Sequence, residues 1–278
     1  MSIHIKINIK IMNELSPLNL SELVQIDFPE NQYYRETTSK NQVVIHHTVS
    51  GGYAQGVINW WNQDPQRIAT HFIIQQDGTI FQLYSSKYWA HHLGVKADFL
   101  KNMGFTDYGT RNTLLNKSTI GIEICRWGGL VKDDNGFHPA KWDTTTKKYV
   151  PYTKITIPVE NVQSFPRPFR DFYHFEKYTS AQLISVSRML TYLCDKFGIS
   201  KEYYGNMWDV SKDALAGKPG IWTHVSYRPD KSDCFPQTEL INMLQNIGPI
   251  KTMPPIYNTP PPYNTPPTLA PDVFRPND

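Results

Sequence analysis

The chain has 278 residues, of which 40% are hydrophobic and 19% are charged, a balance that supports a buried core and excludes wholesale disorder. No run in the sequence approaches the roughly 20 apolar residues that a membrane helix needs. Its 28 Lys and Arg residues against 25 Asp and Glu residues give a net charge of +3, which is too mild to indicate a nucleic-acid-binding protein. Three scattered cysteines do not make a disulfide scaffold, so reduced thiols are expected, although a single bridge stays open.

The N-terminal segment alternates isoleucine with other residues. Isoleucine occupies every second position from Ile3 to Ile11, and this period of two predicts a half-buried strand over residues 3–11. The segment lacks the continuous apolar stretch of a secretory signal peptide, so no signal-directed export is expected. Residues 13–40 are polar and irregular and are expected to form a connecting arm. The strand could pack on the main domain or pair with a protein partner.

An α/β core is expected to begin near residue 41. Hydrophobic periodicity and turn chemistry predict its first elements: a strand over residues 43–45 that ends at His46, a short helix over 54–63, a hairpin over 71–83 that turns at Asp77-Gly78, and a strand over 119–124. These elements alternate between strand and helix, which favours a sheet flanked by helices.

The second half of the chain is less regular. Residues 127–175 show no helical period and are expected to form an insertion of loops with at most one hairpin. Apolar residues then recur at helical spacing as far as Phe197, with Thr179 or Ser180 as a cap and Gly198 as the end. The end of the chain is proline-rich and contains Tyr-Asn-Thr-Pro-Pro twice, which favours an extended tail. The expected parts are an N-terminal strand and arm (1–40), a main domain (41–248, with the insertion 127–175) and the tail (249–278).

Several chemically active residue types fall at strand ends or in loops. His46 ends one predicted strand, Glu123 lies within another, and His224 and Cys234 flank a loop-like segment that contains Lys231. Two imidazole nitrogens with one thiolate or carboxylate satisfy the ligand count of a catalytic zinc site, which keeps its fourth position for water. Each residue taken alone has a structural interpretation: the histidines and Glu123 as polar residues with hydrogen-bond or ion-pair partners, and Cys234 as a small hydrophobic residue. Spacing by itself therefore does not establish a metal site.

Five motifs occur in an order that resembles a known family. They are VVIHHT (43–48), THFIIQQDGTI (70–80), AHHLG (90–94), TIGIEI (119–124) and THVSYRPDKSDCFP (223–236). Together they resemble the zinc-dependent N-acetylmuramoyl-L-alanine amidase family, which includes phage lysozyme-type amidases and peptidoglycan recognition proteins. The resemblance extends over residues 40–245, apart from the insertion, and implies an α/β fold with a central mixed β-sheet flanked by helices.

The resemblance implies one zinc ion per chain, held by His46, His224 and Cys234. His47 is then expected to point to the opposite side of its strand, because strand side chains alternate. Asp233 stays a rival third ligand, since some relatives use aspartate at this place. Cys234 is preferred because thiolate is the better donor to zinc.

The resemblance also implies catalytic roles. Glu123 occupies the position of the catalytic glutamate of one branch, whereas Thr70 stands where the other branch carries a tyrosine. Glu123 would then take a proton from the attacking water and return it to the leaving nitrogen, and Lys231 would offset charge on the oxyanion. Two departures from the family pattern are visible: Phe235 separates Cys234 from the following proline, and the offset of Lys231 from Cys234 is one residue unusual.

Substrate contacts are expected from His92, Trp89 and Thr70. His92 stands in the family's His-Ala-Gly-like motif and can contact glycan or stem peptide, but a structural hydrogen bond is an equal alternative. Tryptophans such as Trp89 can stack on sugar rings, although core packing is their default role. The aromatic-rich insertion, residues 127–175, is expected to line one wall of the substrate groove.

The function implied is hydrolysis of the amide bond between N-acetylmuramic acid and L-alanine in peptidoglycan. The expected lack of a signal peptide and the two extra terminal segments favour a phage endolysin or virion-associated lysin, located in the host cytoplasm before lysis or on the virion. A cytoplasmic enzyme that recycles muropeptides is the other enzymatic context. Two alternatives stay open: a non-catalytic peptidoglycan-binding module, and a phage structural protein with an amidase fold. A protein partner could bind the N-terminal strand or the proline-rich tail.

Overall fold

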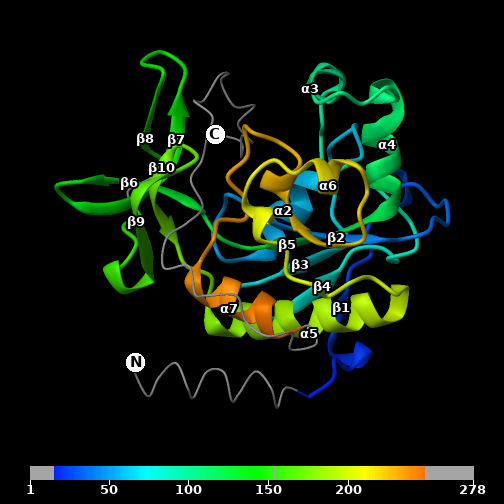
Figure 1. Ribbon diagram of the computed structural model, residues 1–278. Coiled ribbons are helices and arrows are strands. Elements are labelled where there is room, and N and C mark those ends of the chain that lie inside the picture. The colour runs from blue at the N-terminus through cyan, green and yellow to red at the C-terminus, as the bar shows by residue number, and fades with distance from the viewer. Residues whose placement is uncertain (1–15, 153–154, 248–278) are drawn as a thin grey trace.

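A six-stranded mixed sheet forms the centre of the protein (Figure 1). The structure is a computed structural model that describes residues 16–152 and 155–247, so the strand predicted over 3–11 and the proline-rich tail lie outside the described residues. The strand order is β1-β4-β3-β5-β2-β11. The strands are β1 (Val24–Gln25), β2 (Gln42–His47), β3 (Phe72–Ile74), β4 (Ile80–Gln82), β5 (Thr119–Ile124) and β11 (Gly220–Thr223). Every neighbouring pair is parallel except β3 and β4, which confirms the expected α/β class with a mixed sheet.

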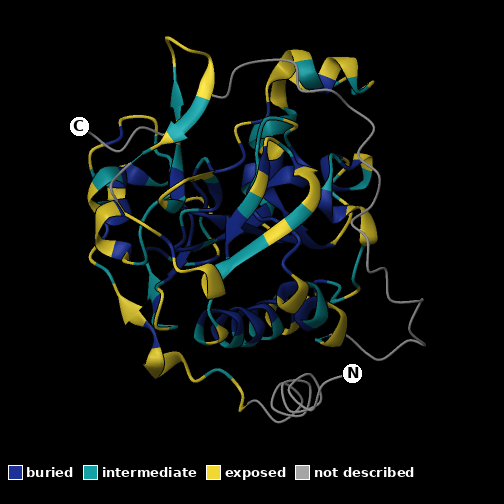
Figure 2. Cartoon of the chain, turned by 90° about the vertical axis from the view of Figure 1, so that its left-hand side faces the viewer, coloured by how far each residue is buried: buried dark blue, intermediate teal, exposed yellow. Residues whose placement is uncertain are grey.

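The helices surround this sheet. They are α2 (Ala54–Trp61), α3 (Ala97–Asn102), α4 (Tyr108–Ser118), α5 (Ser180–Phe197), α6 (Lys212–Leu215) and α7 (Thr238–Asn246), joined by the 3₁₀ turns η1 (Leu20–Glu22), η2 (Glu30–Gln32), η3 (Val159–Asn161), η4 (Gly205–Trp208) and η5 (His224–Ser226). Figure 1 shows α5 and α7 together along one side of the sheet, with α2, α4 and α6 on the other side. Buried residues gather in the sheet and on the inner faces of the helices (Figure 2). None of the described helices is long and apolar enough to span a membrane.

The elements with strong local signals form as the sequence predicts. The strand that carries His46, the hairpin at Asp77-Gly78 and the strand that carries Glu123 are β2, β3–β4 and β5. Gly78 has a φ of +89°, a left-handed conformation that glycine adopts without a steric penalty. Helix α5 begins at a capping box made by Thr179 and Gln182, which satisfies the free N–H groups of its first turn, and it ends at Gly198 with a φ of +66°.

The prediction of loops over residues 127–175 was wrong. This segment forms a second, five-stranded antiparallel sheet in the order β8-β7-β6-β10-β9, which stands at the left of Figure 1. Its strands are β6 (Gly129–Asp133), β7 (Gly136–Asp143), β8 (Lys148–Pro151), β9 (Val162–Phe169) and β10 (Phe172–Glu176). Prolines inside these strands hide the pattern, because proline lacks the N–H that a ladder uses and normally argues against a strand.

The arm before the main domain also contributes to the central sheet. Val24 and Gln25 pair in parallel with Phe81 and Gln82 of β4, so this part of the expected arm is an edge strand. A strand of two residues has no readable period, and its position depends on the tertiary structure.

Candidate active site

Three neighbouring parallel strands deliver polar side chains to one edge of the central sheet. His46 and Glu123 are the last residue but one of β2 and β5, and they stand opposite each other in the ladder. On the other side of β2, Ile45 pairs with Thr223 at the end of β11, so His224 follows that strand directly. The carboxyl ends of parallel strands are where open α/β sheets bind their ligands. The strand register therefore brings both histidines and the glutamate to one place.

A loop that follows β11 adds a carboxylate to the two histidines. His46, His224 and Asp233 are all buried, and one potential ligand atom from each lies within 4.8 Å of the other two. Oδ2 of Asp233 is 3.3 Å from Nδ1 of His46 and 2.9 Å from Nδ1 of His224. The backbone oxygen of Asp233 accepts a hydrogen bond from the N–H of Val225 (3.0 Å), which ties the loop back to η5.

The far nitrogens of both rings are occupied inside the protein. Nε2 of His224 lies 2.9 Å from the carbonyl oxygen of Leu93, and because a carbonyl can only accept, this nitrogen carries the proton. In the neutral ring Nδ1 then has a lone pair that faces the Asp233 carboxylate across 2.9 Å. Two acceptors at this distance need a proton or a cation between them. Two imidazole nitrogens and a carboxylate oxygen are ligands that zinc accepts in catalytic sites, so the donor set fits a zinc ion.

The two histidines and Asp233 shift one another's pKa values. Burial works to raise the pKa of Asp233, but His224 and His46 outweigh it and hold that pKa well below its usual value. Burial, together with the positive charge of His224, lowers the pKa of His46 to about 4. An ionised aspartate beside a neutral His46 imidazole is in the protonation state that metal binding requires.

Cys234, the expected third ligand, does not lie with the histidines. Its side chain is fully buried and makes a hydrogen bond with the hydroxyl of Tyr178, while burial raises the pKa of the thiol well above its ordinary value. The two adjacent side chains have different partners: of the two, the structure brings Asp233 together with His46 and His224, and this favours the rival ligand Asp233 over Cys234.

Glu123 is poised next to this cluster without a partner of its own. Its Oε2 atom is buried and has no hydrogen-bond partner among the described residues. Burial raises the pKa of Glu123 well above its ordinary value, the negative charge of Asp233 adds to this, and Lys231 opposes it. The half-buried Lys231 thus contributes positive charge to the same space. A carboxyl group with an unpartnered buried oxygen and a raised pKa suits proton transfer.

The three residues expected to contact substrate are buried and bonded inside the fold. His92 places its nitrogens against His46 (3.0 Å) and Thr119 (2.7 Å). Thr70 is 1% exposed and its hydroxyl donates to the carbonyl of Phe72, two residues along. Trp89 is 4% exposed, with its ring stacked on Tyr34 at 4.0 Å. His92 and Trp89 thus make the structural contacts that were their alternative interpretation, and contact of the three residues with substrate stays a prediction.

His47 points to the side of β2 opposite His46, as strand alternation predicts. Its Nδ1 lies 2.9 Å from the hydroxyl of Tyr178, and its ring contacts Phe235. Gly128 leaves the room for this ring, because a Cβ at that position would lie 2.2 Å from Nε2 of His47.

The second sheet supports the loop that carries Asp233. The ring of Phe235 is fully buried and stacks on Phe175 of β10, with centroids 4.5 Å apart. Gln163 of β9 donates from its amide to the carbonyl of Pro236 (3.1 Å) and accepts from the backbone N–H of Thr238 (3.1 Å). The insertion is therefore a wall against which the Asp233 loop is packed, a role that no local sequence signal indicated.

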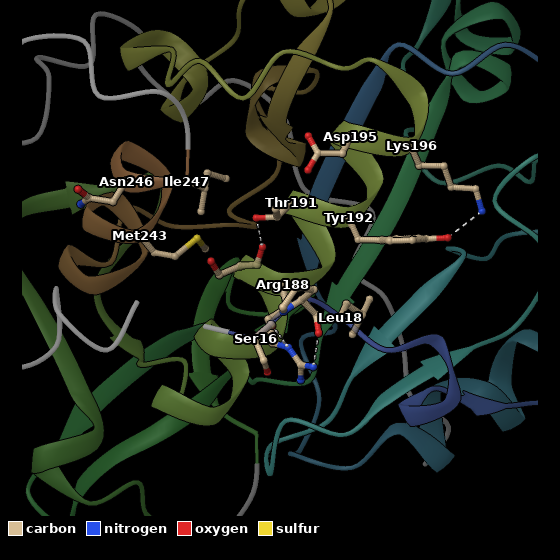
Figure 3. Close-up of a pocket in the computed structure, with 12 residues that line it drawn as sticks. Ser16, Leu18, Arg188, Thr191, Tyr192, Asp195, Lys196, Met243, Asn246 and Ile247 are labelled. Carbon is tan, nitrogen blue, oxygen red and sulfur yellow. Dashed lines mark hydrogen bonds between the residues drawn. The ribbon is translucent and has the colours of Figure 1, made fainter. Parts of the chain in front are cut away.

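A separate pocket of about 660 Å³ lies between α5, α7 and the segment at residues 16–18 (Figure 3). None of the histidines or carboxylates of the cluster lines it. Its charged side chains already have partners: Arg188 binds Glu22, Lys196 donates to the hydroxyl of Tyr192, and Asp195 pairs with Lys201. This pocket therefore offers no chemistry related to that of the strand-end site.

The buried histidines predict how stability depends on pH. Burial lowers the pKa of His47 from 6.5 to about 4, so between these pH values the unfolded chain binds a proton that the folded protein does not. Stability is then expected to fall as the pH falls through this window, by about 3 kcal/mol for this one group. Urea unfolding at pH values from 7 to 4, in a chelator that removes metal, measures the effect. The matched variant His47→Asn, which keeps an acceptor for Tyr178, should show a flatter dependence, and parallel curves would contradict the prediction.

The site and the fold define a class of protein. A mixed sheet that brings two histidines, an aspartate and an unpaired glutamate to the carboxyl ends of its parallel strands is an arrangement suited to metal-assisted hydrolysis. The chain belongs to the N-acetylmuramoyl-L-alanine amidase family, whose model matches residues 36–234. Its enzymatic class is accordingly that of an N-acetylmuramoyl-L-alanine amidase.

Three of the solved structures that are similar to this chain are PlyL, an endolysin amidase and a hydrolase. PlyL is 11% identical, with 82% of this chain and 97% of that chain covered at a TM-score of 0.42. The endolysin N-acetylmuramoyl-L-alanine amidase LysCS from Clostridium intestinale is 15% identical, with 83% and 98% covered and a TM-score of 0.41. The hydrolase AmiA from Staphylococcus aureus, solved with its ligand, is 14% identical, with 87% and 89% covered and a TM-score of 0.43. No curated protein matches the sequence.

Proposed function

We propose that this protein is a zinc-dependent amidase that cuts the bond between N-acetylmuramic acid and L-alanine in peptidoglycan. The observation that carries the proposal is the convergence of Nδ1 of His46, Nδ1 of His224 and Oδ2 of Asp233 beside an unpaired Glu123. A zinc ion held by these three ligands would supply Lewis acidity toward the scissile carbonyl and acidify water at neutral pH.

The remaining chemistry falls to side chains around the cluster. Glu123 accepts a proton from the attacking water and returns it to the leaving nitrogen of L-alanine, a task favoured by its raised pKa and its free Oε2. Lys231, whose charge already acts on Glu123 and His46, stabilises negative charge that develops on the carbonyl oxygen. Both roles are consistent with placement at the edge where β2, β5 and β11 end.

A lysin is the biological context that we favour. The two terminal segments, an alternating N-terminus and a proline-rich end, exceed what an enzyme that recycles small muropeptides needs, and they support a phage endolysin or virion-associated lysin. A peptidoglycan-binding module without catalysis would not need to keep a buried carboxylate oxygen such as Oε2 of Glu123 without a hydrogen-bond partner, and this atom therefore favours the enzyme.

Two measurements on the purified full-length protein test this function. Elemental analysis is expected to find one zinc per chain, and incubation with purified sacculi should release peptides with a new N-terminal L-alanine, identified by mass spectrometry. Removal of the metal with a chelator should stop the release, and Zn²⁺ should restore it. A metal-free protein that binds sacculi without cutting them would instead be a recognition module, and the proposal would be wrong.

A further inference from the structure

The Nε2 atoms of His46 and His224, which face away from Asp233, both contact the same short segment, residues 92–93. His92 contacts Nε2 of His46 through its side chain, and the next residue, Leu93, accepts from Nε2 of His224 through its backbone carbonyl. We propose that His92 and Asn116 are positioning residues: through this segment they fix the tautomers of His46 and His224 so that both Nδ1 lone pairs face one point. The inference rests on the proposed zinc site and adds to it the residues that prepare the site for the metal.

The direction of the hydrogen bonds that run from His46 through His92 to Thr119 follows from the carbonyl of Asn116 at the end of this series, because a carbonyl can only accept. The hydroxyl of Thr119 donates to the backbone carbonyl of Asn116 (3.4 Å), so its oxygen is free to accept from Nε2–H of His92 (2.7 Å). A neutral His92 then has its lone pair on Nδ1, which accepts from Nε2–H of His46 (3.0 Å). His46 is left with a lone pair on Nδ1, the atom that faces Asp233.

Asn116 holds the segment in place. It is fully buried on α4, and its Oδ1 accepts from the backbone N–H groups of both His92 (2.8 Å) and Leu93 (3.1 Å). Its amide nitrogen donates in turn to the carbonyl of Asn112 (2.7 Å), which fixes the orientation of the side chain. One asparagine thus anchors the two consecutive residues that orient the two histidines.

The sheet fixes the His92 ring from the other side. A Cβ at Gly121 of β5 would lie 3.1 Å from Nδ1 of His92, so the strand backbone passes close to the ring. Partners that orient ligand histidines in this way typically change metal affinity by about 10–100-fold when they are removed. Loss of the polar contact between His92 and His46 is therefore expected to weaken metal binding.

A pair of substitutions at His92 separates the polar contact from mere packing. In His92→Asn the side-chain oxygen lies three bonds from Cα, as Nδ1 does in histidine, and can accept from His46. In His92→Phe a flat aromatic ring, somewhat larger than imidazole, is kept and the acceptor is lost. The Zn²⁺ affinity of the full-length protein is measured by competition with a chromogenic chelator, and the Co²⁺-substituted protein gives an absorption spectrum that reports ligand geometry. Tyr84→Phe, which removes a buried hydrogen bond to Ala69, serves as the control.

The two variants have opposite expected results. His92→Phe should weaken Zn²⁺ binding by about 10–100-fold and change the Co²⁺ spectrum, whereas His92→Asn and the control should stay near the wild type. Wild-type affinity in His92→Phe, or equal losses in both His92 variants, would overturn the inference and leave the zinc site standing. His92→Leu replaces the phenylalanine variant if that one does not fold. A wild-type protein that binds no Zn²⁺ would overturn the proposed function itself.

The anchor is tested in the same assay. Asn116→Leu removes the acceptor for both backbone N–H groups and is expected to weaken Zn²⁺ binding at least as much as His92→Phe, since it releases the partners of both histidines. Asn116→Leu with unchanged Zn²⁺ affinity would remove Asn116 from the inference.

Discussion

The Glu123→Gln variant is expected to keep its zinc and to lose about 10²–10⁴-fold in kcat on peptidoglycan. Glutamine has nearly the same shape as glutamate but cannot take a proton from water, so only proton transfer is removed. Glu123 is not among the three residues whose ligand atoms converge, and its Oε2 atom has no partner that the substitution would orphan. The measurement is zinc content together with the initial rate of peptide release from sacculi, with the exposed Glu239→Gln as the control.

Glu123→Gln is also expected to change how the stability of the protein depends on pH. Burial raises the pKa of Glu123 above 4.5, so the folded protein keeps a proton that the unfolded chain loses as the pH rises past that value. In metal-free wild type this group therefore costs stability as the pH rises from about 4.5 toward the folded pKa, and the cost is absent in Glu123→Gln. The variant should be the more stable protein at neutral pH and equal to wild type near pH 4. Hydrolysis at close to the wild-type rate would show that another group is the base.

The parts of the site that lie on regular strands could be predicted from the sequence. His46 follows one short β-branched run and Glu123 lies near the end of another, and the parallel register of β2 and β5 then makes them neighbours. The pattern of the sequence predicts their places on strands, whereas their roles as ligand and base follow from the resemblance to the family. The helix α5 was equally readable because its cap, its period and its final glycine agree.

What the sequence could not supply is which of two adjacent loop residues faces the histidines. Asp233 and Cys234 are both plausible donors, and the choice depends on Phe235, which the second sheet holds against Phe175. That sheet was itself missed, since its strands contain prolines and are stabilised by their neighbours. The role of Asn116 was invisible for the same reason: it depends on hydrogen bonds to a segment more than 20 residues away in the chain.

Asp233→Ala and Cys234→Ala form a matched pair of neighbouring truncations with opposite expected effects. Removing Asp233 deletes one of three ligands and leaves two lone pairs facing each other without a counter-charge, so Zn²⁺ affinity should fall by more than the roughly 100-fold that loss of an outer partner causes. Peptide release should disappear with the metal. Cys234→Ala removes only a buried thiol that contacts Tyr178, and we expect it to keep one zinc per chain and measurable activity at a cost of about 1 kcal/mol in stability.

Comparing Asp233→Ala with Cys234→Ala shows whether the position of a side chain or the strength of its donor atom decides which residue binds zinc. Thiolate is the softer ligand and the better donor to zinc, yet burial holds the Cys234 thiol in its protonated form and its hydrogen bond directs it to Tyr178. For Cys234 to reach the metal, the loop would have to turn over and withdraw Phe235 from its stack on Phe175, which would expose a fully buried ring. Loss of zinc in Cys234→Ala with zinc kept in Asp233→Ala would mean that this rearrangement takes place on metal binding. The packing of Phe235 argues for the opposite result.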